Sequence, residues 1–187
     1  MLLTGGASSR MGVDKASLEF RGVRLADRTA RLLEEVADPT VEVGPGYTHL
    51  QAAPDLDPRL GPLSAVVRGF AAIQAMGWTG PVIVVATDLP LLTGGLLAWL
   101  AGHPSSRSVV PIDSLRPQPL CARYQPEDLE TAADLFRGGT RTMRELLAAI
   151  DALLVGPEEW SLPAGHPLAL ADADTPADVE RLRQVNR

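Results

Sequence analysis

The sequence predicts a single α/β domain over residues 1–187, with three layers in a Rossmann-like arrangement and a mostly parallel central sheet. Two observations predict this fold class. Short apolar runs alternate along the chain with segments of helical periodicity, which is the pattern of β-α units around a parallel sheet. The clearest run, Val82–Ala86, is continuously apolar after Gly80-Pro81 and is typical of a central strand. No linker-like stretch divides the chain into two domains.

The remaining elements are predicted from the same signals in chain order. A very short first strand, residues 1–3, precedes a glycine-rich loop. Proline is well tolerated at the first helical position, so Pro126 is expected to begin a helix, and Thr142 with Glu145 has capping-box spacing. Further strands are expected at 41–43, 108–112, 119–124, 152–155 and 168–171. Helices are expected at 25–36, 63–73, 96–101, 126–136, 142–150 and from Thr175-Pro176 onward.

Composition and charge limit the partners that the chain is expected to have. A net charge of −6 and an aromatic content of 4% argue against a general nucleic-acid-binding surface. Any phosphates must therefore be held locally by a few cations, backbone amides or a metal. No run approaches the roughly 18 apolar residues of a membrane span, and no secretory pattern begins the chain. We expect a cytoplasmic protein with no nucleic-acid and no membrane partner.

The segment from Gly5 to Lys15 combines the features that phosphate binding requires. Its glycines allow backbone N–H groups to approach phosphate oxygens closely, and Ser8 and Ser9 add hydroxyl donors. Arg10 offers a planar fork for two oxygens, while Lys15 supplies a compact charge. The Walker A spacing is absent. The simpler interpretation is a solvated turn rich in glycine, serine and cations.

The string G-G-x-S-x-R-M-G-x-D-K over residues 5–15 resembles the signature of the MobA-like nucleotidyltransferases. This group includes molybdenum cofactor guanylyltransferases, cofactor cytidylyltransferases and sugar-nucleotide pyrophosphorylases. Four short segments are similar to further family motifs in the same order: Gly61-Pro62-Leu63, Ala86–Leu91 with its D-x-P motif, Gln118–Tyr124 and Asp172–Pro176. The resemblance covers the length of the chain. It implies the nucleotide-diphospho-sugar transferase type of fold.

Two aspartates are candidates for binding Mg²⁺. Asp88 follows a buried strand, and ligands of open α/β sheets bind outside the carboxyl ends of the strands. A carboxylate there suits Mg²⁺, which takes few protein ligands. The resemblance implies a second ligand in the late segment, for which Asp174 is favoured over Asp172. The alternatives are a turn or helix-cap role for Asp88, and a turn into the last helix for Asp174.

The resemblance implies transfer of GMP from GTP to the phosphate of molybdopterin or molybdenum cofactor, with Mg²⁺ as cofactor and release of pyrophosphate. Arg10, Lys15 and Asp88 are then the catalytic residues. The nucleotide-binding residues are expected to be Leu3, Thr4, Gly5, Gly6, Ser8, Lys15, Asp55, Gly61, Pro62, Leu63 and Asp88. An acceptor that is already an ionised phosphate needs no general base. The implied partners are GTP or another nucleoside triphosphate, the acceptor, and, transiently, molybdenum cofactor enzymes or their chaperones.

Several interpretations stay open at this level. A cytidylyl transfer, a sugar- or polyol-phosphate nucleotidyl transfer, or a non-catalytic nucleotide sensor would use the same fold. Asp55 fits a solvated loop as well as a base contact. Arg141 and Arg144 fit either a phosphorylated acceptor or an exposed helical face. Cys121 is expected to be a small core residue, and the three histidines show no metal-ligand spacing.

Overall fold

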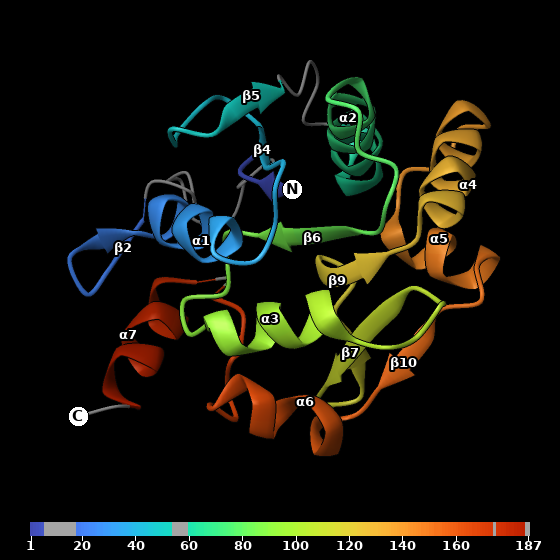
Figure 1. Ribbon diagram of the computed structural model, residues 1–187. Coiled ribbons are helices and arrows are strands. Elements are labelled where there is room, and N and C mark those ends of the chain that lie inside the picture. Colours follow the sequence, from blue (N-terminus) through green and yellow to red (C-terminus); the bar gives the residue numbers. More distant parts are fainter. Residues whose placement is uncertain (6–17, 54–59, 174, 186–187) are drawn as a thin grey trace.

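A computed structural model describes residues 1–5, 18–53, 60–173 and 175–185 (Figure 1). The strands are β1 (Leu2–Leu3), β2 (Glu19–Phe20), β3 (Val23–Arg24), β4 (Val41–Val43), β5 (Gln51–Ala53), β6 (Val82–Ala86), β7 (Val109–Asp113), β8 (Arg116–Pro117), β9 (Cys121–Tyr124) and β10 (Leu153–Val155). The helices are α1 (Leu25–Glu34), α2 (Pro62–Ala75), α3 (Gly94–Gly102), α4 (Pro126–Arg137), α5 (Met143–Ala149), α6 (Pro157–Ala164) and α7 (Pro176–Gln184).

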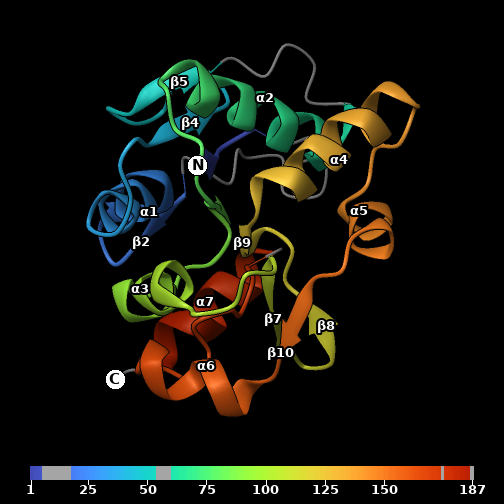
Figure 2. The ribbon, with the colours of Figure 1, turned by 45° about the vertical axis from the view of Figure 1, so that its right-hand side comes forward.

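β6 is the centre of an eight-stranded sheet with the order β10-β7-β9-β6-β1-β4-β5, in which β8 pairs with β7. β6 pairs with β1 in parallel, and β1 pairs with β4 in parallel. β9 runs antiparallel to both of its neighbours, β6 and β7. Figure 2 shows β7, β8 and β10 together at the far end of the sheet from β5. The mostly parallel sheet that the sequence predicts is confirmed.

The sheet separates two helical layers because alternate residues of a strand point to opposite faces. On one face, Val82 and Val84 of β6 join a core formed with α2, α4 and α5. On the other face, Ile83 and Val85 join a core formed with α1, α3 and α6. Figure 1 shows these helices on the two sides of the sheet. The predicted three-layer fold is therefore confirmed.

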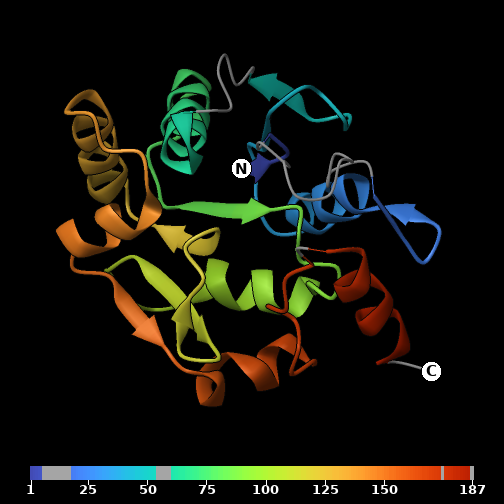
Figure 3. The same ribbon diagram turned by 180° about the vertical axis from the view of Figure 1, so that it is seen from behind.

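A third, smaller core joins the β2–β3 hairpin to the C-terminal helix. Phe20 and Leu25 pack there with Leu91, Val179 and Leu182. Figure 3 shows α7 on the same side of the molecule as this hairpin. The contact brings the segment that follows residues 6–17 and the segments on either side of residue 174 into one region.

The helix signals agree well with the structure, but one predicted strand is wrong. Thr142 and Thr175 cap α5 and α7 as predicted, each accepting a hydrogen bond from the backbone N–H three residues later. The segment Leu168–Ala171, predicted as a strand, is a turn in which Ala169 N donates to His166 O. Within this turn Ala169 and Leu170 are both fully buried. No helix in the described part of the chain is long and apolar enough to cross a membrane.

Candidate active site at the carboxyl edge of the sheet

Three parallel strands end side by side at one edge of the sheet. Leu3, the last residue of β1, is in register with Val43 of β4 on one side and with Ala86 of β6 on the other. Neighbouring strands lie about 4.8 Å apart. The segment Thr4-Gly5 and the segment Thr87-Asp88 therefore leave the sheet from adjacent strands.

The start of the glycine-rich loop is bound closely to β4. Thr4 N and Gly5 N both donate to Val43 O, at 3.0 and 3.3 Å. A Cβ atom on Gly44 would lie 2.1 Å from Thr4 Oγ1 and 2.8 Å from Gly5 N. Only glycine fits at position 44 without displacing Thr4 and Gly5, and sequence reasoning had not selected this residue.

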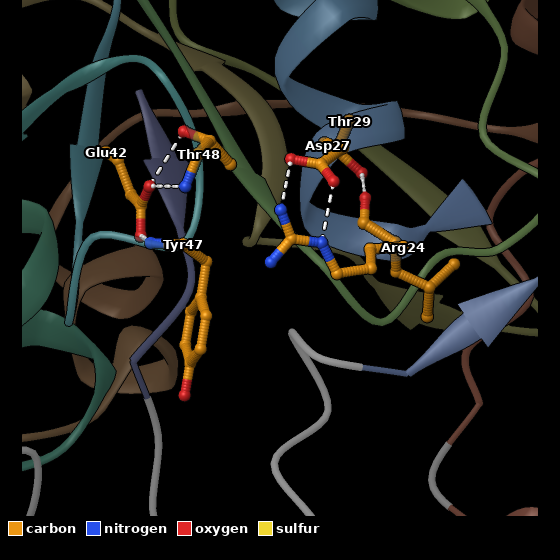
Figure 4. Close-up of polar contacts among 7 residues, drawn as sticks. Arg24, Asp27, Thr29, Glu42, Tyr47 and Thr48 are labelled. Atoms are coloured by element: carbon orange, nitrogen blue, oxygen red, sulfur yellow. Dashed lines mark hydrogen bonds and ion pairs between the residues drawn. The ribbon is translucent and has the colours of Figure 1, made fainter.

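Glu42, in the middle of β4, is a fully buried carboxylate that binds the same region together (Figure 4). Oε1 accepts hydrogen bonds from Thr4 Oγ1 at 2.6 Å, Gly46 N at 3.0 Å and Tyr47 N at 2.7 Å. Oε2 accepts from the backbone N and the Oγ1 of Thr48, both at 2.7 Å. Glu42 thus links the start of the loop to the turn after β4.

The ionisation of Glu42 follows from this environment. Burial by itself would raise the pKa of its carboxyl group, but hydrogen bonds from the Thr4 and Thr48 side chains and from the Tyr47 and Thr48 backbone outweigh burial. The net effect lowers the pKa below its ordinary value. Glu42 is therefore an ionised structural carboxylate, and the only signal in the sequence was a charged residue between Val41 and Val43.

Asp88 lies directly beyond β6 and is half-buried, as predicted from its place after the apolar run. Its backbone O accepts a hydrogen bond from Ala173 N at 2.9 Å. The pKa of Cys121, the first residue of β9, is raised to about 12, mainly by burial and further by the negative charge of Asp88. Asp88 is thus surrounded by β6, β9 and the segment before α7. Cys121 is a buried core residue, as predicted.

The Ala173 hydrogen bond bears on the second candidate ligand. Asp172 and Asp174 flank Ala173 in the sequence, so both lie within one residue of the backbone contact with Asp88. Asp172 is exposed, and Asp174 lies outside the described residues. Among the residues that the structure describes, no group of three or more His, Cys, Asp or Glu side chains could hold a metal ion.

The Gly61-Pro62-Leu63 segment begins α2 at the same edge, because α2 leads back into the parallel strand β6. Gly61 has a φ of +83°, and a Cβ atom there would lie 2.6 Å from Arg141 O. Leu63 N donates to Arg141 O at 3.4 Å, and Ser64 N donates to Gly61 O at 3.2 Å. The first amides of α2 are therefore bonded within the protein, and this segment shapes the edge of the site.

Arg141 and Arg144, near the start of α5, differ in their surroundings. Arg141 Nη1 donates to the backbone oxygens of Phe136 and Thr140 at 2.9 and 2.7 Å. Its guanidinium carbon lies 4.6 Å from the centre of the Phe136 ring. Arg144 is exposed on α5. The hydrogen bonds therefore hold Arg141 at the end of α4. Arg144 lies on an exposed helical face, which was one of the two interpretations given for it.

Several predicted site residues lie outside the described part of the chain: Gly6, Ser8, Arg10, Lys15, Asp55 and Asp174. Their assigned roles stay predictions. In the described part, Leu3 is in register with Ala86, so Thr4-Gly5 and Asp88 follow neighbouring strands.

Solved structures with the same fold include nucleotidyltransferases. The molybdopterin-guanine dinucleotide biosynthesis protein A from Archaeoglobus fulgidus has a TM-score of 0.76 at 20% identity, over 98% of this chain and 96% of that one. The 2-C-methyl-D-erythritol 4-phosphate cytidylyltransferase from Thermus thermophilus has a TM-score of 0.66 at 19% identity, over 98% of each chain. At these identities the likeness establishes the fold.

The sequence comparisons establish the family. The model of the MobA-like NTP transferase domain matches residues 1–153. A probable molybdenum cofactor guanylyltransferase from Mycobacterium avium is 34% identical, over 99% of this chain and 94% of its own length. A molybdenum cofactor guanylyltransferase from Xanthomonas euvesicatoria is 29% identical, over 100% and 94%. The chain is a nucleotidyltransferase and belongs to the MobA-like NTP transferase family.

Proposed function

We propose that this protein transfers GMP from GTP to the phosphate of molybdopterin or molybdenum cofactor in the cytoplasm, with Mg²⁺, and releases pyrophosphate. The proposal is supported by the relatives named molybdenum cofactor guanylyltransferase, which match along nearly the whole chain. It is also supported by the order of the five motifs in the sequence. Transient contact with molybdenum cofactor enzymes or their chaperones would follow from such a product.

The observation that carries the proposal is the register between β1 and β6. Leu3 lies opposite Ala86, so the start of the glycine-rich loop and the segment that carries Asp88 follow adjacent parallel strands. Nucleotidyl transfer requires that arrangement, because the triphosphate and its counter-charge must meet at one point. A nucleotide sensor would need the loop but would not need a carboxylate beside it.

The oxygen donors at this edge fit Mg²⁺, which prefers carboxylate ligands and keeps several sites for phosphates and water. Asp88 and Asp174 would hold it, since the bond from Ala173 N to Asp88 O joins their two segments. When bound, the ion would neutralise negative charge on the α-phosphate and on the attacking phosphate.

The chain's own residues would then perform the binding and charge stabilisation. Gly5 would let the backbone approach the phosphates closely, and the amide of Gly6 and the hydroxyl of Ser8 would bind phosphate oxygens. Arg10 and Lys15 would stabilise the charge that grows on the leaving pyrophosphate. Asp55 and the Gly61–Leu63 segment would contact the base and ribose. The acceptor attacks as an ionised phosphate, so no side chain has to remove a proton.

The test is pyrophosphate release with each of the four ribonucleoside triphosphates, Mg²⁺ and a phosphorylated pterin acceptor. We expect release with GTP that requires the acceptor and stops on addition of a chelator of divalent metals. Turnover with CTP alone would overturn the guanine assignment. Binding of GTP without turnover on any phosphorylated acceptor would overturn the transferase proposal in favour of a sensor.

A further inference from the structure

A cavity of about 220 Å³ lies between the β2–β3 hairpin, α1 and the turn that follows Asp88. Phe20 and Arg21 line it from the hairpin, Arg28 from α1, and Pro90 and Thr93 from the turn. Pockets for drug-sized ligands have volumes of roughly 300–1,000 Å³. This cavity is smaller than such pockets and suits a small group such as a phosphate.

Arg28 is the most unusual side chain of this cavity. Its Nη2 donates to Leu92 O at 2.5 Å, whereas its Nη1 is buried and has no hydrogen-bond partner among the described residues. Leaving a buried charged donor unsatisfied destabilises the folded state, so native structures rarely do so. Arg28 thus lines the cavity with a guanidinium whose donors are not all used by the described residues.

A second arginine lines the same cavity. Arg21, at the turn of the hairpin, has its guanidinium carbon 5.2 Å from the centre of the Phe20 ring. Burial lowers the pKa of Arg28, and the positive charge of Arg21 lowers it further, so the two side chains repel each other. Among the described residues that line the cavity, none carries a carboxylate. The charge of the pair is therefore not compensated by any lining side chain.

We propose that this cavity is an oxyanion site in which Arg28 and Arg21 bind a phosphate group. A guanidinium can donate two parallel hydrogen bonds to phosphate oxygens, and a dianion would neutralise both cations. The part of the turn that lines the cavity begins two residues after Asp88, so the phosphate of the acceptor is one candidate for the bound group. Free inorganic phosphate is the other. The binding of phosphate here does not depend on the proposed function, whereas the assignment of the site to the acceptor rests on it.

The full chain offers a matched control for this proposal. Arg24 lies on the same hairpin, but its fork is paired with Asp27 through contacts of 2.7 and 3.1 Å (Figure 4). Arg24→Gln removes the same charge as a cavity variant and leaves the cavity unchanged. Arg21→Asn removes a cavity charge without a risk to the fold, since Arg21 is exposed and has a φ of +55°, which asparagine tolerates well. Arg28→Gln removes the buried donor itself.

The experiment is titration of each protein with inorganic phosphate, without nucleotide or metal, followed by backbone amide NMR and calorimetry. We expect binding by the unsubstituted chain, with shifts at Gly22 and Thr93, and a Kd raised about tenfold or more by Arg21→Asn and by Arg28→Gln. Arg24→Gln should change it less than about twofold. No binding by the unsubstituted chain, or an equal effect of all three substitutions, would overturn the proposal.

A kinetic experiment separates the two sources of phosphate. A higher KM for the phosphorylated acceptor in Arg21→Asn, with kcat unchanged, would assign the site to the acceptor. An unchanged KM, together with an effect of added phosphate on the unsubstituted enzyme alone, would assign it to free phosphate. Failure of the enzyme to turn over GTP would overturn the proposed function and leave the phosphate titration intact.

Discussion

Glu42 and Asp88 are two carboxylates on either side of β1, and their surroundings differ. Glu42 lies within β4, is fully buried and accepts five hydrogen bonds from protein donors. Asp88 lies beyond the end of β6 and is half-buried at the edge of the sheet. An ionised carboxylate has about four lone-pair sites. Glu42 is therefore saturated by the protein and unsuited to a ligand, whereas Asp88 has the position of a ligand-binding group.

A carboxylate within a strand and one beyond its end meet different physical demands. A charge inside a buried strand has to be satisfied by neighbouring backbone and hydroxyl groups, which fixes the local fold. A charge one or two residues beyond the strand faces the space where substrates bind. Substitutions in the two regions should therefore separate stability from activity.

The largest expected effect is on folding, from Glu42→Ala. It leaves the Thr4 and Thr48 hydroxyls and the amides of residues 46–48 without their acceptor, so we expect a loss of about 4 kcal/mol in the free energy of unfolding. Urea denaturation measures it. Glu130→Ala, an exposed change on α4, serves as the control and should lie within about 0.5 kcal/mol of the original chain. A loss below about 1 kcal/mol for Glu42→Ala would contradict the structural role of this residue.

The second effect is on activity, from Asp88→Asn. We expect kcat/KM for pyrophosphate release to fall about a hundredfold or more, or ~2.7 kcal/mol, because the charge that balances the phosphates is removed. The free energy of unfolding should change by less than about 1 kcal/mol. Asp151→Asn, an exposed aspartate paired with Arg107, is the matched control and should retain activity. Full activity of Asp88→Asn would refute the metal-ligand assignment.

A third substitution, Gly44→Ala, tests the contact between β4 and the start of the loop. The new Cβ would collide with Thr4 Oγ1 and Gly5 N, so we expect a cost of about 2 kcal/mol and weaker binding of nucleoside triphosphate. Thermal unfolding with and without nucleotide measures both quantities. Gly46→Ala is the control, since its Cβ would have no neighbour closer than 4.0 Å, and only its φ of +88° opposes the change, at about 1 kcal/mol. Equal effects of the two substitutions would show that the close approach is unimportant.

The smallest effect is the contribution of Glu42 to the pH dependence of stability. Its pKa in the folded protein lies below its ordinary value of 4.5. The unfolded chain therefore takes up this proton first, so the stabilisation is present above the unfolded pKa and is lost as the pH falls through the folded pKa. Urea unfolding below about pH 5 should show a steeper loss for the original chain than for Glu42→Gln. Parallel curves for the two proteins would contradict the lowered pKa.

Much of the fold was predictable because its signals are local. The run Val82–Ala86 indicated a central strand, and Thr175 with Asp178 indicated the start of the last helix; both are confirmed. Residues Leu168–Ala171 form a turn and were wrongly predicted as a strand. Their apolar character reflects the packing of this turn, which bends at His166, against the core. The hairpin β2–β3 and helix α6 were not predicted. α6 buries Trp160, whose Nε1 donates to Ile112 O at 3.0 Å, a contact 48 residues distant in the sequence.

The candidate site likewise contains residues that were predictable from the sequence and residues that were not. Asp88 and the Thr4-Gly5 start of the loop were predicted from position and from motif. Glu42 and Gly44 were missed, because what distinguishes them is the chain that approaches them from another strand. The same reason applies to Arg21 and Arg28. In the sequence they are ordinary turn and helix residues, and only the fold places them in one cavity with the turn after β6.

The sequence by itself determined the α/β class, the central strand, the phosphate-loop signature and the carboxylate beyond β6, because each depends on residues that are neighbours in the chain. The tertiary structure decided that β1 lies between β4 and β6 and that β9 enters antiparallel. It also decided that the carboxylate of Glu42 is saturated with hydrogen bonds from the protein, while Asp88 lies at the edge of the sheet. These are consequences of strand order and register, which bring together groups that are distant in the sequence and so leave no local pattern to read.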